Sequence, residues 1–356
     1  MRLTIGIPTL NEERHILRTL NSIQDQLHNL DLDIEVIVID NGSHDATQLI
    51  VKEYINTISS KKFDVRLVVN PKNLGFSFSC DELIRICSGD YLWILGAHDR
   101  LLPGSLKEIE NYLNRFHPHS LLLNATVYDE KTDTVLNQSI YKYGFVRIGE
   151  NEYSVHGRES FFSEYYGPCQ SVSLNITASE SLKSVLNEEL ETKYWGFYQR
   201  ICDGVIKSDN NRFGFIQAPS VEIMLKYDGW QYIKKDTFGE KEENHTHTGF
   251  LVVMDMATLA IKRYRSHPFI QKNIGVWLDT FAIPRAIAES KFTGMRTSPK
   301  ILLLSYMAFR KSLWYWCIGL PMLLIPGFIL SPRLLEICRR TVHGIRRVTG
   351  QYGQDA

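Results

Sequence analysis

The sequence has no excess of charge of either sign, because 40 lysines and arginines balance 40 aspartates and glutamates over 356 residues. A chain without a net positive field lacks the long-range attraction that draws proteins to nucleic acid. We therefore expect no nucleic acid among its partners. The sequence also lacks the low hydrophobicity of a disordered chain, since 44% of its residues are hydrophobic, and a packed core is expected.

Cysteine motifs and an export signal are missing as well. The six cysteines form no CxxC pair and show no spacing typical of a zinc site or a disulfide framework, which indicates buried thiols in a reducing compartment. They are Cys80, Cys87, Cys169, Cys202, Cys317 and Cys338. Residues 3–7 form an apolar strand pattern without the charged region, long apolar run and cleavage site of a signal peptide. We therefore do not expect export.

The first 130 residues alternate strand patterns with helix patterns. Ile16, Leu17, Leu20, Ile23 and Leu27 recur at helical spacing between the first two strands. This alternation is typical of βαβ units, so the prediction is an α/β fold with a parallel sheet whose faces are covered by helices. The predicted strands are 3–8, 34–39, 65–69, 91–95 and 121–128.

The pattern changes after residue 128. Residues 129–167 mix aromatic and polar side chains without a clear period, which favours a loop region near substrate. Strands are expected again at 171–177 and 213–224, with a helix at 194–205 and further helices after residue 245. The predicted domains are a catalytic domain at 1–235, with halves 1–128 and 129–235, a helical extension at 236–299 and a distinct segment at 300–356.

The segment 300–356 combines a long uncharged run with basic flanks. Residues 312–332 carry no charge, and about 20 apolar residues can span a bilayer as a helix. Pro321 and Pro326 within this run favour a shallow hairpin or an in-plane helix over a straight span. Eight lysines and arginines against one acidic residue in 300–347 favour contact with anionic lipid. A buried helix pair packed on the catalytic domain is the alternative.

Polar residues follow the first predicted strand at the point where it ends. Pro8, Thr9, Asn11 and Glu12 lie at this strand-to-helix turn. Ligands of open parallel sheets bind beyond the carboxyl ends of the strands. The turn is therefore placed to line a nucleotide pocket, and a polar turn that caps the first helix is the alternative.

The second predicted strand ends in Asp40 and Asn41, followed by Gly42 and Ser43. A carboxylate at this position can hydrogen-bond a base or a ribose, while Gly42 permits a tight turn and Ser43 can cap the next helix. Turn and cap chemistry alone would explain Gly42 and Ser43. It would leave Asp40 without a role.

A third element begins with the turn 70–75, which contains Asn73 and Gly75, and ends with a buried strand that emerges as His98 and Asp99. An imidazole beside a carboxylate can hold a divalent ion against a diphosphate. A loop histidine bonded to the backbone and an aspartate that caps a helix are the alternatives.

Taken together and in this order, the segments IPTLNE, VIDNGSHDAT, NPKNLGFS and SGDYLWILGAHD resemble the inverting family 2 glycosyltransferases. The resemblance implies the GT-A fold, a Rossmann-like nucleotide-binding sheet flanked by helices. It places His98 and Asp99 in the loop that binds the metal and the sugar diphosphate. The residues that it assigns to the nucleotide sugar are Pro8, Thr9, Asn11, Glu12, Asp40, Asn41, Asn73 and Gly75.

The sequence departs from the family pattern in the metal loop. Gly96 and His98 occupy its first two acidic positions, which leaves Asp99 as the one carboxylate. The cofactor implied is a divalent cation, Mn or Mg. Imidazole suits manganese better than magnesium, so we expect a manganese preference. Asn41 stands where many relatives have a second aspartate, and because an amide both donates and accepts, the base of the donor stays open.

Inversion requires a base that deprotonates the acceptor hydroxyl. The family often supplies it from an acidic pair before an aromatic-rich helix, where this sequence offers Glu191, with Glu188 and Glu189 as alternatives. A solvated or capping glutamate is the competing interpretation. The predicted acceptor side consists of Gln170, Ser171, Lys226 and Trp230.

The resemblance is to bacterial enzymes of O-antigen and capsular polysaccharide assembly, including the abequosyltransferase-like subgroup. It implies transfer from a nucleotide sugar, with inversion, to a saccharide carried on polyprenyl diphosphate at the cytoplasmic face of the membrane. The alternative is a catalytically silent GT-A module that binds a nucleotide sugar or a partner enzyme. A nucleotidyltransferase fits less well, because an early glycine-rich loop with a following arginine and lysine is lacking.

Overall fold

A computed structural model describes most of the first 225 residues and short parts of the remainder. The described residues are 1–28, 30–58, 63–130, 134–137, 153–164, 172–191, 195–225, 259, 262–277, 302, 305–306, 316 and 320–324. The chain forms two compact units. The first contains Met1–Tyr166, Gln170–Leu190 and Trp195–Gly239, and the second contains Gly167–Cys169, Glu191–Tyr194 and Glu240–Ala356.

The first unit is built on one sheet, in which the described strands follow the order β3-β2-β1-β4-β9-β6-β10-β5, with β7 beside β6 and β8 beside β10. The strands are β1 (Arg2–Thr9), β2 (Asp33–Asp40), β3 (Phe63–Val69), β4 (Tyr91–Ile94), β5 (Arg100–Leu101), β6 (Ser120–Asp129), β7 (Thr134–Asn137), β8 (Tyr153–His156), β9 (Asn175–Ala178) and β10 (Phe213–Leu225). The helices are α1 (Ile16–Gln24), α2 (Thr47–Thr57), α3 (Phe76–Ile86), α4 (Ser105–Phe116), α5 (Arg158–Glu164), α6 (Ser179–Ser184) and α7 (Gly196–Lys207).

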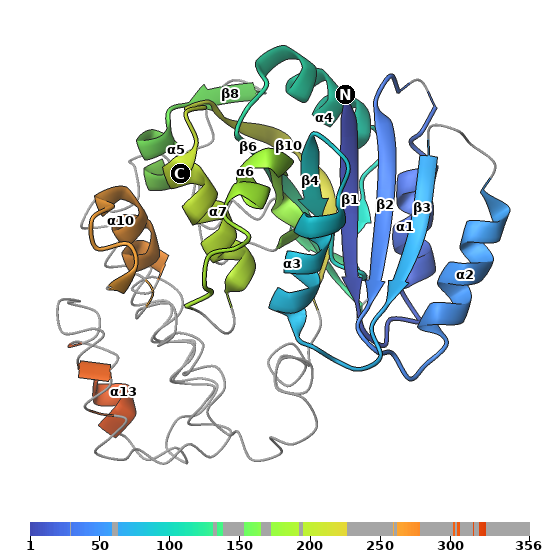
Figure 1. Cartoon of the computed structure of the whole chain (residues 1–356), viewed down its shortest axis with the longest axis horizontal. Helices are drawn as coiled ribbons and strands as arrows, with labels where there is room; N and C mark the ends of the chain where they lie inside the picture. Colours follow the sequence, from blue (N-terminus) through green and yellow to red (C-terminus); the bar gives the residue numbers. More distant parts are fainter. Residues whose placement is uncertain are drawn as a thin grey trace. The chain divides into compact units, whose positions relative to one another are not determined.

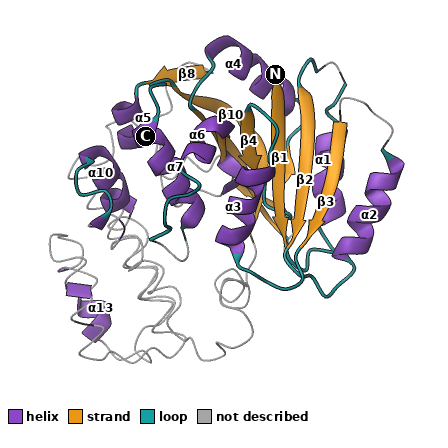
Figure 2. Ribbon diagram, in the orientation of Figure 1, coloured by secondary structure: helices purple, strands orange, loops and turns teal. Residues whose placement is uncertain are grey.

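The strands β3, β2, β1 and β4 lie side by side and are all parallel (Figure 1). Helix α3 lies in front of them and α1 behind them in Figure 2. Because both faces are covered, β2 is buried from Ile34 to Asp40, which explains its continuous apolar run. The predicted α/β class and the parallel pairing of these strands are confirmed.

The prediction of a parallel sheet is wrong between β4 and β6. Strand β9 lies between them and runs antiparallel to both. The sheet is therefore mixed, and β4 and β6 point the same way without pairing. The pattern around β4 and β6 cannot show this insertion, because β9 comes from a segment much later in the chain.

The second unit contains α10 (Pro268–Trp277) and α13 (Leu320–Leu324) among its described residues. Tyr264, Ile270 and Ile274 are buried there. Within the described part of the chain, no helix is long and apolar enough to cross a membrane. Most of the uncharged run 312–332 lies outside the described residues.

Candidate active site

The loops that follow β1, β2 and β3 meet at the carboxyl edge of the sheet. Register places Thr9 opposite Asp40. The Asn41 amide N–H donates to the carbonyl oxygen of Thr9 at 2.9 Å, and the Asn70 N–H donates to the carbonyl oxygen of Asp40 at 2.8 Å. The sheet pairing thus continues past the strand ends and fixes the start of each loop.

Asp40 is fully buried at this edge. Its Oδ2 accepts hydrogen bonds from the Ser43 N–H at 3.0 Å and from Nε2 of Gln48 at 2.8 Å. Its Oδ1 and the neighbouring Oγ1 of Thr9 are buried without a hydrogen-bond partner among the described residues. A buried polar atom without a partner costs about 1–3 kcal/mol, so these two atoms are suited to meet a ligand.

Asn41 is used inside the protein. Its Nδ2 donates to Oδ1 of Asn73 at 2.8 Å, and its Oδ1 accepts from Nδ2 of Asn70 at 3.1 Å and from the Leu74 N–H at 3.0 Å. Asn73 Oδ1 also accepts from the Gly75 N–H at 2.9 Å. Asn41 and Asn73 therefore hold the loop at 70–75 in this structure, and their predicted contact with the nucleotide stays a prediction.

Gly42 allows the two loops to approach. Its φ is +83°, and a Cβ at this position would lie 2.8 Å from the main chain of Lys72. The turn after β1 is tied to the same region, because the Asn11 N–H donates to Oγ of Ser43 and the His44 N–H donates to Oδ1 of Asn11, both at 2.9 Å. Asn11 adopts a φ of 54°. Pro8 pairs with Ile39 in the ladder just before this turn.

The loop after β4 contains the predicted metal residues, and it turns Asp99 inward. Asp99 is 2% exposed. Its Oδ2 accepts from Oγ of Ser173 at 2.5 Å, and its Oδ1 accepts from the Met224 N–H at 3.0 Å. A Cβ at Gly96 would lie 2.7 Å from Oδ2 of Asp99. Because Gly96 has no side chain, the Asp99 carboxylate has room to pack against it.

His98 is the more accessible residue of the predicted pair, with 28% of its side chain exposed. Its Nδ1 lies 3.1 Å from Oε1 of Glu12. Its Nε2 lies 4.0 Å from Oδ1 of Asp99, beyond hydrogen-bond distance. Glu12 is 3% exposed, and its Oε2 meets Nδ1 of His15 at 3.0 Å. The Glu12 carboxylate thus contacts two imidazoles.

These residues do not form a cation site of their own. Protein sites for divalent cations supply several ligands, most of them carboxylate oxygens or imidazole nitrogens. Both oxygens of Asp99 accept hydrogen bonds from inside the protein, and both oxygens of Glu12 face histidines. Among the described residues, no three histidine, cysteine or acidic side chains gather in a way that would hold a metal ion.

The three candidate bases lie just before α7. Glu188 forms an ion pair with Lys207, and Glu191, in the second unit, pairs with Arg263 at 2.9 Å. Glu189 is exposed, and its carbonyl oxygen accepts from Nε2 of Gln199 at 2.9 Å. Glu189 and Glu191 are both exposed, and Glu189 is the one of the three without an ion pair among the described residues.

Arg200 anchors the segment that carries these glutamates, a role that the sequence did not predict. It is 2% exposed, and its Nε and Nη2 bind the two carboxylate oxygens of Asp81 at 3.0 and 2.8 Å. Its Nη1 donates to the carbonyl oxygens of Val185 and Glu188, each at 2.8 Å. An arginine within the buried face of α7 was the one available signal. The predicted acceptor residues Gln170, Ser171, Lys226 and Trp230 lie outside the described residues.

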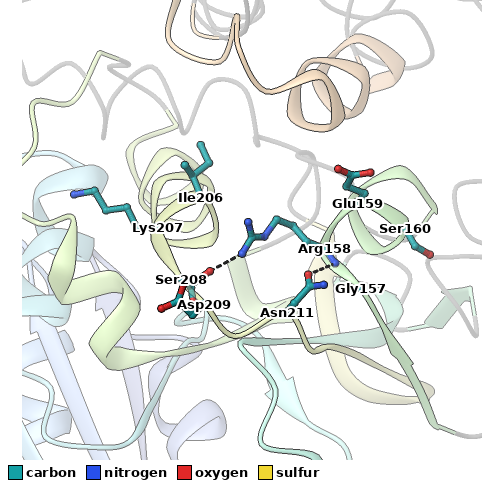
Figure 3. A pocket seen from close by; sticks show the side chains of 9 residues that line it. All are labelled: Gly157, Arg158, Glu159, Ser160, Ile206, Lys207, Ser208, Asp209 and Asn211. Carbon is teal, nitrogen blue, oxygen red and sulfur yellow. Dashed lines mark hydrogen bonds between the residues drawn. The ribbon is translucent and has the colours of Figure 1, made fainter.

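A polar pocket of about 560 Å³ lies at the opposite edge of the sheet, near the start of β10 (Figure 3). Arg158 crosses it and donates from Nη2 to the carbonyl oxygen of Ser208 at 2.5 Å, and its main-chain N–H donates to Oδ1 of Asn211 at 2.8 Å. Because β10 runs parallel to β6, this pocket is far along the strands from Asp40. It is not part of the candidate active site.

Comparisons with known proteins agree with this architecture. Residues 4–167 match the family model described as Glycosyl transferase family 2. Abequosyltransferase RfbV of Salmonella typhimurium is 32% identical over 114 residues, which are 32% of this chain and 33% of that protein. An uncharacterized glycosyltransferase of Methanocaldococcus jannaschii is 26% identical over 229 residues, which are 63% of this chain and 70% of that protein. The match with the abequosyltransferase thus spans about a third of its length.

A solved structure supports the fold. The mannosyltransferase PcManGT from Pyrobaculum calidifontis, in complex with GDP-Man and Mn²⁺, has a TM-score of 0.52 and 15% identity, and the likeness covers 98% of this chain and 87% of that one. The mixed sheet and its flanking helices are those of this fold class. Residues 4–167 are thus similar to the glycosyl transferase family 2 model, and the chain has the GT-A fold.

Proposed function

We propose that this chain is a glycosyltransferase that transfers a sugar from a nucleotide-sugar donor to a saccharide acceptor with inversion. The observation that carries the proposal is a pair of buried atoms at the carboxyl edge, Oδ1 of Asp40 and Oγ1 of Thr9, which have no hydrogen-bond partner in the described part of the chain. They can bind the N–H groups of a base or the hydroxyls of a ribose. The match to the family model and the activities named for the similar proteins support the same class of reaction.

The proposed reaction is a direct displacement. A base takes the proton of the acceptor hydroxyl, the oxygen attacks the anomeric carbon, and the nucleoside diphosphate leaves from the opposite face. Glu189 is the preferred base, because its side chain is exposed and has no ion pair among the described residues. Glu188 and Glu191 are the alternatives, although each has a basic partner in Lys207 or Arg263.

The proposed acceptor is a saccharide linked to polyprenyl diphosphate, in the biosynthesis of a surface polysaccharide. We place the reaction at the cytoplasmic face of the membrane, with residues 300–356 in peripheral or monotopic contact and Gln170, Ser171, Lys226 and Trp230 on the acceptor side. Support comes from the eight basic residues that flank the uncharged run and from the abequosyltransferase relative. Sedimentation with anionic vesicles tests the membrane contact. It compares the full chain with a variant in which these eight lysines and arginines are replaced by glutamine.

The divalent cation that the resemblance implies remains a prediction. PcManGT was solved with Mn²⁺, whereas the described residues of this chain do not form a cation site. Activity measured after chelation, and again after adding Mn²⁺ or Mg²⁺, shows whether the protein needs a divalent cation and which of the two ions it prefers. Full activity in chelator would contradict the prediction of a metal.

Incubation of the purified protein with UDP, GDP, CDP and dTDP sugars tests the proposed function. We expect one donor to be hydrolysed slowly or transferred, and Asp40→Asn to slow the reaction strongly at low donor concentration while the protein stays folded. Absence of both reactions, in the presence of lipid acceptor and metal, would favour a silent GT-A module. The ion pairs of Glu188 and Glu191 are the observations that favour this second candidate.

A further inference from the structure

Helices α3, α6 and α7 pack against one another (Figure 1). The segment 185–190 directly follows α6 and carries Glu188 and Glu189, two of the three candidate bases. The residues of this segment belong to neither a helix nor a strand. Its position in the first unit must therefore be fixed by contacts with its neighbours.

Two consecutive side chains of α7 supply these contacts. Nη1 of Arg200 donates to the carbonyl oxygens of Val185 and Glu188, each at 2.8 Å. Nε2 of Gln199, which is fully buried, donates to the carbonyl oxygen of Glu189 at 2.9 Å. Three main-chain carbonyl groups of the segment are thus bound to one turn of α7.

Asp81 fixes the Arg200 guanidinium to α3. Its two carboxylate oxygens accept from Nε and Nη2 of Arg200 at 3.0 and 2.8 Å. A bidentate pair sets the plane of the guanidinium as well as its distance, so Nη1 stays aimed at the segment 185–190. Helix α3 begins directly after Gly75, at the end of the predicted nucleotide loop 70–75. The pair therefore connects this loop to the segment that carries the glutamates.

The first residue of α7, Gly196, makes a second connection. A Cβ at this position would lie 2.7 Å from Oγ of Ser77, in the first turn of α3, and 3.2 Å from Cδ1 of Leu190. The start of α7 therefore packs closely against both α3 and the end of the segment.

We propose that Arg200 is a positioning residue, which holds the main chain of 185–190 so that its glutamate reaches the acceptor hydroxyl beside the donor. The proposal rests on the proposed function for the role of that glutamate as the base. Because Arg200 is 2% exposed, it acts through the segment rather than by touching a substrate. A catalytic group displaced by about 1 Å can lose on the order of 100-fold in rate, so a loose segment should slow turnover.

Two variants separate positioning from charge balance. Arg200→Lys keeps a positive charge beside Asp81, but one ammonium cannot replace the planar fork that binds a carboxylate and two carbonyl groups at once. A lysine should suffice if Arg200 only neutralises Asp81. The double variant Asp81→Leu/Arg200→Met removes both charges together, and apolar replacement of a buried ion pair often preserves stability.

Arg66→Lys is the matched control. Arg66 has the same kinds of partner, because its Nη2 donates to Oε1 of Glu35 at 3.2 Å and to the carbonyl oxygen of Ile86 at 2.6 Å. Among the described residues, it hydrogen-bonds to none of 185–190. A general cost of replacing arginine by lysine would appear in this variant too.

Hydrogen exchange of the full chain, followed by mass spectrometry, tests the holding of the segment without any substrate. The amides of Leu186 and Glu188 are hydrogen-bonded in the structure. We expect Arg200→Lys and the double variant to raise their exchange roughly 10–100-fold, the range for a hydrogen bond to a charged group, and Arg66→Lys to leave it unchanged. Unchanged exchange at 185–190, an equal rise along the whole chain, or loss of folding in both variants would overturn the proposal.

Kinetics of donor hydrolysis or transfer test the consequence for the reaction. We expect Arg200→Lys to lower kcat roughly 10–100-fold with KM for the donor unchanged. Glu189→Gln should lower kcat of the wild type by roughly two to four orders of magnitude, and by a smaller factor in an Arg200→Lys background, because the base is already displaced there. Equal losses in both backgrounds, or a higher KM with unchanged kcat, would overturn the proposal.

A wild type that is inactive towards every donor would refute the proposed function instead. Hydrogen exchange would then decide by itself whether Arg200 holds the segment 185–190.

Discussion

Two buried aspartates at the same edge of the sheet have opposite surroundings. Asp40, at the end of β2, uses Oδ2 for internal hydrogen bonds and leaves Oδ1 without a described partner. Asp99, in the loop after β4, uses both oxygens, one for Ser173 and one for Met224. A motif treats both residues as ligands. We infer from these hydrogen bonds that Asp40 can accept from a ligand and that Asp99 stabilises the fold.

The largest expected effect comes from Asp99→Ala. This substitution leaves the Met224 N–H and the Ser173 hydroxyl without their acceptor, and an unpaired buried donor costs about 1–3 kcal/mol. We expect the free energy of unfolding to fall by about 2–5 kcal/mol in urea titrations. A stable Asp99→Ala protein whose only defect is nucleotide binding would instead make Asp99 a ligand.

His119 extends the comparison to the amino edge of the sheet, where it precedes β6. It is buried and bonded like Asp99, with Nδ1 2.8 Å from Oγ of Ser120 and Nε2 2.7 Å from Oγ of Ser181. Burial, with a contribution from Arg158, lowers the pKa of His119 to about 4 from an ordinary value of 6.5.

The folded protein therefore favours the neutral form of His119. Its contribution to stability is complete above pH 6.5 and is lost as the pH falls from 6.5 towards 4, to a limit on the order of 3 kcal/mol. Unfolding free energies of the wild type and His119→Gln, measured between pH 7.5 and 4, should converge as the pH falls. Parallel curves would show that His119 does not carry this dependence.

Gly96→Ala tests whether the packing of the Asp99 carboxylate depends on the space beside Gly96. The new Cβ would lie 2.7 Å from Oδ2 of Asp99, and overpacking of this kind costs about 1–3 kcal/mol. We expect a lower thermal midpoint. The destabilisation should largely disappear in an Asp99→Ala background, because the clashing atom is gone. Additive losses in the double variant would place the strain elsewhere.

The sequence predicted that Asp40 ends the second strand at the carboxyl edge of the sheet, and the structure confirms this position. The prediction follows from local signals, since a buried strand of alternating or continuous apolar residues ends where polar residues begin. The same reasoning could not distinguish Asp40 from Asp99. The hydrogen-bond partners that make Asp99 structural, Ser173 and Met224, are 74 and 125 positions away in the chain.

Glu12 also shows that contacts between residues distant in the sequence cannot be predicted from local patterns. Its contact with His15 is three positions away and can be read from helical spacing, but its contact with His98 is 86 positions away. The resemblance therefore assigned Glu12 to the nucleotide, whereas the structure places it between two imidazoles. Pairings made by distant segments, including the insertion of β9 between β4 and β6, lie beyond what local patterns record.

The measurement that tests the central claim most directly is nucleotide binding by Asp40→Asn. The asparagine oxygen can still accept from Ser43 and Gln48, so only the atom that faces the ligand changes from an acceptor to a donor. Calorimetric titration with UDP, GDP, CDP and dTDP should show a preferred nucleotide for the wild type. Asp40→Asn should weaken its binding roughly 10–100-fold, the range for a hydrogen bond to a charged group, with unchanged unfolding free energy. Equal affinity in both proteins would contradict the assignment of this edge as the nucleotide site.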